Sequence, residues 1–235
     1  MKQYLKKVLS ERMLGMYDYY TKRDWKHSWG GAFNGQAHRQ KIYLQILSTG
    51  IDAIVETGTF RGTTTEFMSN HFNGMIYSTE LNERSFGYST ARFLFNPRVR
   101  LHHQDSRILL KSLFSGNQLK EKRIFFYLDA HWETDLPLAE EIDIIFSHCN
   151  YPIIMIDDFQ VPGDSGYQFD DYGPGKALTI DLFSQVTGHE FYRFFPSLQS
   201  SEETGAKRGC TVITNSQAVA EKLKTLDSLT EHSWV

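Results

Sequence analysis

Five short apolar runs alternate with helical patterns along the middle of the chain, and this alternation constrains the fold more than any other feature. The apolar runs lie at residues 52–58, 75–81, 98–105, 123–131 and 151–159. Amphipathic stretches separate them, at residues 63–74, 83–95, 106–114 and 137–149. Strands that alternate with helices indicate parallel βαβ units. The sequence therefore predicts an α/β fold with a Rossmann-like, doubly wound sheet and helices on both faces.

The end of the chain departs from this rhythm. Residues 175–188 have a helical pattern, and two further apolar runs, 189–197 and 208–216, are joined by a polar segment. Two strands joined by a polar loop are typical of an antiparallel hairpin. We therefore expect seven strands, mostly parallel, with the hairpin at the C-terminal end and a helix over about 218–226.

The N-terminal part of the chain is helical in pattern and precedes the first strand. Its apolar positions between residues 4 and 16 have helical spacing, residues 25–36 are typical of a loop, and a second helix ends at Gly50. The first helix would pack on the domain or on a second subunit, so it would suit a homodimer.

These patterns divide the chain into three parts. We expect an N-terminal helical extension over residues 1–50, a ligand-binding domain over 51–215 and a C-terminal helical tail over 216–235. Within the domain, Thr63 and Glu66 have the spacing of a capping box at a helix start.

Composition excludes several classes of protein. The 235 residues carry a net charge of −3, which gives no general attraction to nucleic acid. No apolar stretch is long enough to span a bilayer, and the N-terminus does not have the pattern of a signal peptide. Two cysteines do not make a disulfide framework, so we expect a cytoplasmic protein.

Each predicted parallel strand ends in at least one carboxylate. The acids are Glu56, Glu80, Asp105, Asp129 and the adjacent pair Asp157 and Asp158. A single acid at such a position is commonly a helix cap. Because open α/β sheets bind their ligands at the carboxyl ends of the strands, acids at five strand ends in register predict a site at this edge.

A glycine turn, Glu-Thr-Gly-Thr-Phe-Arg-Gly at residues 56–62, follows the first strand. Gly58 and Gly62 let the backbone approach a ligand, but their spacing is not the Gly-x-Gly-x-x-Gly of pyrophosphate-binding turns. Glu80 is placed to accept two ribose hydroxyls. A nucleoside without a diphosphate therefore fits better than NAD or ATP. The alternative is a turn that only packs a helix on the strand.

Asp129, Asp157 and Asp158 come from two strand ends that could be neighbours. Without a cationic partner, three carboxylates would repel one another and raise their own pKa values. A hard divalent cation would remove that conflict, and an all-oxygen donor set suits Mg²⁺, Mn²⁺ or Ca²⁺. In the alternative interpretation Asp158 caps a turn and only one acid matters.

Together these motifs resemble the class I S-adenosylmethionine (SAM)-dependent methyltransferases over about residues 51–215. The resemblance implies that Glu56, Gly58, Thr59 and Gly62 form the first SAM-binding motif, that Glu80 binds the ribose, and that Asp105 and Ser106 contact the adenine. The segments around residues 127–142 and 153–159 are also similar to metal-dependent O-methyltransferases of the catechol, macrolide-sugar and cephalosporin-biosynthesis types. That similarity implies a divalent cation on Asp129, Asp157 and Asp158.

The resemblance implies in-line methyl transfer to a metal-activated hydroxyl of a small molecule or sugar. The catechol type has Asp-His-Trp-Lys, whereas this chain has Asp129-Ala-His131-Trp-Glu, so no lysine matches the base. His131 is the candidate general base, beside Asp129 as a catalytic residue. Gln36 is expected near the donor carboxylate, and the loop over 160–179 is expected to close over the acceptor.

Three rivals remain open at this point. They are a nucleotide-dependent oxidoreductase on a similar sheet, a SAM-binding domain without turnover, and a metal-independent methyltransferase acting on nitrogen or carbon. The glycine spacing disfavours the first rival, the full set of strand-end acids disfavours the second, and the lack of an Asn/Asp-Pro-Pro-Tyr/Phe run disfavours nucleic-acid amino-methylation, one form of the third.

Overall fold

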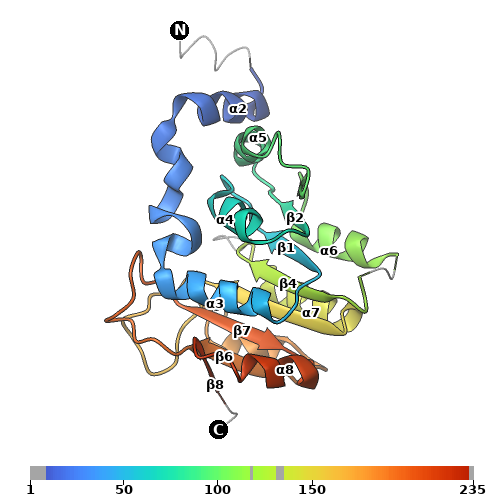
Figure 1. Ribbon diagram of the computed structural model, residues 1–235, viewed down its shortest axis with the longest axis vertical. Helices are drawn as coiled ribbons and strands as arrows, with labels where there is room; N and C mark the ends of the chain where they lie inside the picture. The colour runs from blue at the N-terminus through green and yellow to red at the C-terminus, as the bar shows by residue number, and fades with distance from the viewer. Residues whose placement is uncertain (1–8, 117–118, 131–134, 233–235) are drawn as a thin grey trace.

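The computed structural model describes residues 9–116, 119–130 and 135–232. The five predicted parallel strands lie in one sheet, in the order β3-β2-β1-β4-β5 (Figure 1). Their bounds are β1 Ala53–Thr57, β2 Met75–Thr79, β3 Val99–His102, β4 Arg123–Leu128 and β5 Tyr151–Asp157. The chain order reverses between β1 and β4, which makes the carboxyl ends of these two strands the switch point of the sheet.

An antiparallel hairpin extends the sheet beyond β5, as predicted. It consists of β6 Tyr192–Pro196 and β7 Cys210–Thr214, with β7 inserted between β5 and β6. The sheet has an eighth strand that the sequence did not predict, β8 Leu229–Glu231, which pairs with β6. This strand is three residues long and contains no apolar run. Pairing with the free edge of β6, rather than side-chain pattern, makes it a strand.

Helices cover both faces of the sheet. On one face lie α6 Ser106–Phe114, α7 Leu138–His148 and the short 3₁₀ helix η3 Ile180–Gln185; on the other lie α3 Ala37–Ser48, α4 Thr63–His71 and α8 Gln217–Leu223. Strand side chains alternate between two buried clusters, with Phe126 in the first and Phe125 in the second. Each such side chain contributes about 1.5–3 kcal/mol by burial, so both helix layers are held to the sheet.

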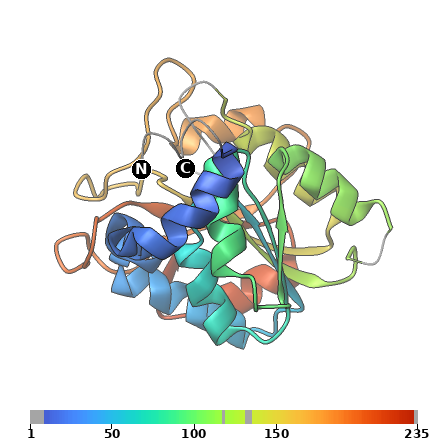
Figure 2. The same cartoon turned by 90° about the horizontal axis from the view of Figure 1, so that it is seen from above.

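The N-terminal extension folds back onto its own domain through α2 Glu11–Thr21, which crosses α5 Glu83–Arg92 (Figures 1 and 2). Two glycines make the crossing close. A Cβ atom at Gly15 would lie 2.0 Å from the carbonyl oxygen of Arg84, and one at Gly87 would lie 2.0 Å from that of Arg12. Either distance is far inside van der Waals contact, so both positions require glycine.

Three local expectations were wrong. Residues 175–188 contain only η3, because Leu178 exchanges backbone hydrogen bonds with residues 160 and 170 instead of continuing a helix. The loop predicted over 25–36 contains two 3₁₀ segments, η1 Arg23–Gly30 and η2 Ala32–Gly35. Thr63 and Glu66 form no capping box, because the N-cap of α4 is Gly62 in a left-handed conformation.

The segment after β7 is more than the predicted helical tail, since it contains both α8 and β8. Among the residues described, no helix combines the length and the apolar character that crossing a membrane requires.

Candidate functional site

The carboxyl ends of β1, β4 and β5 meet at the switch point of the sheet. The register pairs Thr57 with Leu128, and Leu128 with Ile156, so the residues that follow these strands share one edge. Gly58 has a φ of 91°, and a Cβ atom there would lie 2.2 Å from the carbonyl oxygen of Asp129. Glycine at this position therefore allows the turn after β1 to touch the end of β4.

Glu80 holds the glycine turn to the end of β2. Its two carboxylate oxygens accept hydrogen bonds from the backbone N–H of Phe60 (2.6 Å) and of Asn82 (2.7 Å). The N–H groups of Gly58 and Thr59 donate to the carbonyl of Thr79. Burial raises the pKa of Glu80, and the backbone donors act against this shift. The turn and the acid predicted to bind ribose are thus one connected unit.

Glu56 and Thr59 point into the protein rather than along the edge. The Glu56 carboxylate accepts hydrogen bonds from the hydroxyls of Thr65 on α4 and Ser78 on β2, and burial raises its pKa to about 7. The Thr59 hydroxyl lies 2.6 Å from that of Ser78. These side chains pack α4 and β2 against β1, which is the role that the alternative interpretation gave to the turn.

Asp105 is the N-cap of α6. It accepts a hydrogen bond from the backbone N–H of Arg107 at 2.8 Å and pairs with the guanidinium of the same residue at 2.6 Å. These bonds lower the pKa of Asp105. Ser106, the first residue of α6, is buried. The predicted adenine contact of this pair stays a prediction.

The three aspartates predicted as metal ligands do converge. Asp129, Asp157 and Asp158 each offer a carboxylate oxygen, and these oxygens lie within 4.8 Å of one another. Burial, followed by the charges of Asp157 and Asp158, raises the pKa of Asp129 well above its usual range. Burial and Asp157 also raise the pKa of Asp158 to about 7. This mutual repulsion is the condition that a bound cation would relieve.

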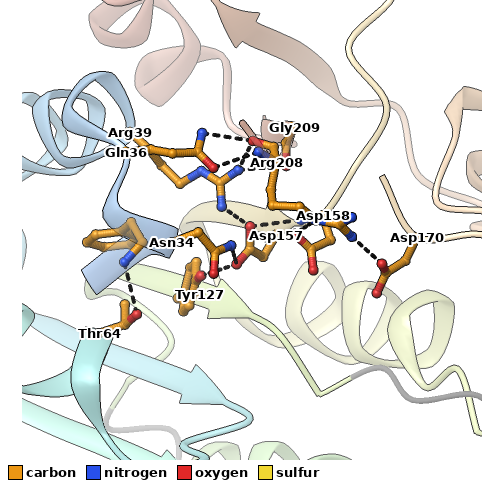
Figure 3. A network of polar contacts seen from close by, with 11 residues as sticks. Asn34, Gln36, Arg39, Thr64, Tyr127, Asp157, Asp158, Asp170, Arg208 and Gly209 are labelled. Carbon is orange, nitrogen blue, oxygen red and sulfur yellow. Dashed lines mark hydrogen bonds and ion pairs between the residues drawn. The ribbon is translucent and has the colours of Figure 1, made fainter. Parts of the chain in front are cut away.

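Asp157 is surrounded by hydrogen-bond donors (Figure 3). One carboxylate oxygen accepts from the guanidinium of Arg39 and from the backbone N–H of Asp158. The other accepts from the hydroxyl of Tyr127 and, at 3.3 Å, from the amide of Asn34. An ionised carboxylate accepts about four hydrogen bonds, so Asp157 has no capacity left in this arrangement.

The premise that the cluster has no cationic partner was wrong. Arg39, buried in α3, pairs with Asp157, and Arg208 pairs with Asp158 at 2.7 Å and with Asp170 (Figure 3). Arg39 also donates to the carbonyl of Gly209 at 2.9 Å. The sequence could not reveal these partners, because Arg39 lies 118 positions and Arg208 lies 50 positions from its aspartate.

Other predicted contacts fall differently around this cluster. Gln36 is buried, and its side-chain amide exchanges hydrogen bonds of 2.9 and 2.7 Å with the backbone of Arg208. It therefore holds the segment that leads into β7. Asp170, in the loop over 160–179, reaches the cluster through Arg208. The candidate base His131 lies outside the described residues.

Solved structures with a similar architecture include two O-methyltransferases. An O-methyltransferase from Bacillus cereus in complex with SAH has a TM-score of 0.55 at 16% identity, covering 90% of this chain and 94% of its own. The O-methyltransferase TomG from Streptomyces achromogenes, involved in tomaymycin synthesis and in complex with SAM, has a TM-score of 0.57 at 13% identity, covering 91% and 94%. This chain has the class I methyltransferase fold.

The methyltransferase fold does not by itself decide the reaction. A spermidine synthase from Thermotoga maritima has a TM-score of 0.52 at 9% identity, covering 83% of this chain and 67% of its own. No protein-family model matches the chain, and no curated protein matches it. Because one fold supports several reactions, the function has to be argued from the site.

Proposed function

We propose that the chain is a SAM-dependent O-methyltransferase that acts on a hydroxyl of a small molecule or sugar, with residues 51–215 as its catalytic domain. The observation that carries the proposal is that two groups of polar residues lie along the same edge of the sheet, at the carboxyl ends of the strands. The turn over 56–62, held by Glu80, supplies the nucleoside side, and the cluster of Asp129, Asp157 and Asp158 supplies the acceptor side. Methyl transfer needs the two substrates aligned in line, which a shared edge provides.

Glu80 has the capacity to bind the donor. An ionised carboxylate accepts about four hydrogen bonds, and two backbone N–H groups occupy part of that capacity in Glu80. The remaining lone pairs can accept from ribose hydroxyls. We propose that the backbone of Gly58 and Gly62 lies against the methionine part of SAM, and that Asp105 and Ser106 border the adenine.

The aspartate cluster fits a hard divalent cation in its donor type and spacing. Three carboxylate oxygens within 4.8 Å of one another suit Mg²⁺. Burial, together with the charge of Asp157, raises the pKa values of Asp129 and Asp158, and a bound cation would offset that repulsion. Asp157 would have to release one donor, and the Asn34 amide at 3.3 Å makes the longest of its contacts. When bound, the ion would lower the pKa of an acceptor hydroxyl.

The proton of the acceptor hydroxyl needs a base at the same edge. Asp129 lies at this edge, beside Asp157 and Asp158. We propose Asp129 and His131 as the residues that receive this proton. Arg208 fixes Asp158 and Asp170, and so closes the loop over 160–179 toward the cluster.

Binding and turnover test the proposal separately. Isothermal titration with SAH and with NAD should show binding of SAH alone, and Glu80→Gln should weaken it about tenfold or more, since a charged acceptor is lost. Glu83→Gln is the matched control, because Glu83 is exposed on the next helix. Binding of NAD instead of SAH would favour an oxidoreductase.

A panel of catechols and sugars, supplied with labelled SAM, then tests turnover. Methyl transfer should stop on addition of a chelator and return with Mg²⁺. Full activity with the chelator would remove the cation from the proposal, and SAH binding without transfer to any acceptor would leave a non-catalytic SAM-binding domain.

We further propose a cytoplasmic location, which the free, buried thiols of Cys149 and Cys210 support. A homodimer through the N-terminal helices remains a proposal as well. α2 uses one side to pack on α5 but leaves Met13 and Tyr20 exposed, so a second chain could cover them. Sedimentation of the Met13→Ser variant against the unaltered chain would test this contact.

A further inference from the structure

A cavity of about 260 Å³ lies outside the strand-end edge, between α2, η1 and the start of α5. Figures 1 and 2 show α2 lying against α5, where the cavity is found. Its chemistry comes from six side chains: Asp18, Lys22, Trp25, Arg61, Arg84 and Tyr88. Arg61 lies in the glycine turn over 56–62, but its side chain lines this cavity, and the other five residues belong neither to that turn nor to the aspartate cluster.

The lining is positively charged. Three of the six side chains are cations and one is an acid, which leaves two positive charges in excess. Asp18 is buried and pairs with Lys22 at 3.0 Å and with Arg84 at 2.6 Å. Asp18 therefore orients two of the cations and offsets one charge of the lining, and Glu11, outside the lining, also pairs with Arg84 at 3.5 Å.

Arg61 is the cation that remains. Its guanidinium carbon lies 3.6 Å from the centre of the Trp25 ring and 4.6 Å from that of Phe60, so the group is held between two aromatic faces. Its one hydrogen bond goes to the hydroxyl of Ser28 at 3.3 Å. Among residues 9–116, 119–130 and 135–232, no carboxylate lies within ion-pair distance of Arg61. A guanidinium has five N–H donors, and most of these are left for a ligand.

Tyr88 gives an independent indication of a missing ligand. Its side chain is 1% exposed and lines the cavity, and its hydroxyl has no hydrogen-bond partner in the described part of the chain. Tyr19 packs edge-on against its ring at 5.3 Å, which fixes the ring in place. A buried hydroxyl without a partner is unfavourable, because it has lost its hydrogen bonds to water and gained none in return. A ligand oxygen in the cavity would remove that cost.

We propose that this cavity binds a phosphate group, held by Arg61, Lys22 and Arg84 with the Tyr88 hydroxyl as a further donor. The two excess positive charges of the lining match a phosphate dianion. A guanidinium group can donate two parallel hydrogen bonds to two oxygens of one phosphate. The indole of Trp25 forms an apolar wall against which an attached sugar or base could stack. SAM carries no phosphate, so the ligand proposed here differs from the proposed methyl donor, and the inference does not depend on methyl transfer.

Titration calorimetry with three probes tests the site and identifies the source of the phosphate. The probes are inorganic phosphate, glucose 6-phosphate and glucose, each added to the full chain. Both phosphates should bind, glucose should not, and added salt should weaken binding. Tighter binding of glucose 6-phosphate assigns a phosphate monoester, and equal binding assigns the free anion. Absence of binding by both phosphates at millimolar concentrations overturns the proposal.

Two conservative variants locate the binding to this cavity. Arg61→Gln should weaken phosphate binding about tenfold, which is about 1.4 kcal/mol, and Tyr88→Phe should weaken it about threefold to tenfold. Tyr88→Phe should leave the unfolding midpoint unchanged or higher, since the hydroxyl has no partner to lose. The controls are Arg12→Gln, another arginine over an aromatic ring, and Tyr20→Phe on the exposed side of α2. Equal losses in variants and controls would contradict the assignment.

Discussion

Asp157 combines a proposed role with an observed one. Its sequence position, at the end of the fifth strand and beside Asp158, predicts a metal ligand. Its surroundings make it a structural anchor, because Arg39 from α3, Tyr127 from β4 and Asn34 from η2 all converge on its carboxylate. Removing one partner of a buried ion pair leaves an uncompensated charge in the interior. The energy that holds these three elements together therefore depends on Arg39.

Replacement of Arg39 by methionine should lower the free energy of unfolding by about 3–5 kcal/mol, because Asp157 would then be buried without a cation. Chemical denaturation measures the loss. Adding Asp157→Asn to the Arg39→Met chain should recover most of it, since the unpaired charge is gone. Lys41, on the same helix, pairs with the exposed Asp227, so Lys41→Met should change stability by under about 1 kcal/mol. An equally stable Arg39→Met chain would show that the ion pair contributes nothing.

The residue-level part of the site was only partly predictable. The positions of Glu80, Asp129, Asp157 and Asp158 follow from strand ends, which the sequence reveals. The roles of Arg39 and Arg208 depend on contacts between segments 118 and 50 positions apart, and neither residue has a local pattern that marks it. Glu56 was assigned to the ligand, yet its neighbours Thr65 and Ser78 turn it to the interior.

At the scale of elements, the side-chain pattern predicted the strands that are buried on both faces of the sheet. The five parallel strands are continuous apolar runs, because helices cover both sides of them. Pattern failed where backbone pairing decides the structure, as in β8 and in the segment around Leu178. The sequence predicts that the first helix packs on the domain or on a second subunit, but not that it crosses α5. Gly15 and Gly87 mark this crossing, yet a helical glycine reveals a close contact only once its neighbour is known.

Gly87→Ala should displace α2 from α5 while leaving the sheet folded. The new Cβ atom would lie 2.0 Å from the carbonyl oxygen of Arg12, and neither backbone can move without separating the helices. Hydrogen exchange should therefore speed up in α2 and not in β1, β4 or β5. Glycine costs about 0.5–1 kcal/mol relative to alanine inside a helix, so without this contact the substitution would stabilise α5. A more stable variant with unchanged exchange in α2 would contradict the crossing.

At the scale of the whole molecule, burial of acids at the switch point makes stability depend on pH. Glu56 lies beneath the glycine turn and Glu141 lies on α7, on the opposite face of the sheet, and both are buried. Burial raises the pKa of each to about 7. Both acids therefore hold a proton in the folded state at pH values where the unfolded chain has released it. This edge of the sheet thus rests on groups that resist ionisation.

Stability should fall as the pH rises from about 4.5 through about 7, because the folded chain binds more protons than the unfolded chain in this window. The stabilisation that Glu141 contributes is complete below the unfolded pKa and is lost above the folded pKa, and it amounts to at most about 3 kcal/mol. Glu141→Gln cannot ionise, so its unfolding free energy should depend less on pH and exceed that of the unaltered chain above pH 7. Glu140→Gln is the control at the neighbouring exposed position, where the carboxylate pairs with Arg107. Parallel pH profiles for the unaltered chain and Glu141→Gln, measured by urea denaturation, would show that Glu141 titrates normally and that its burial carries no energetic cost.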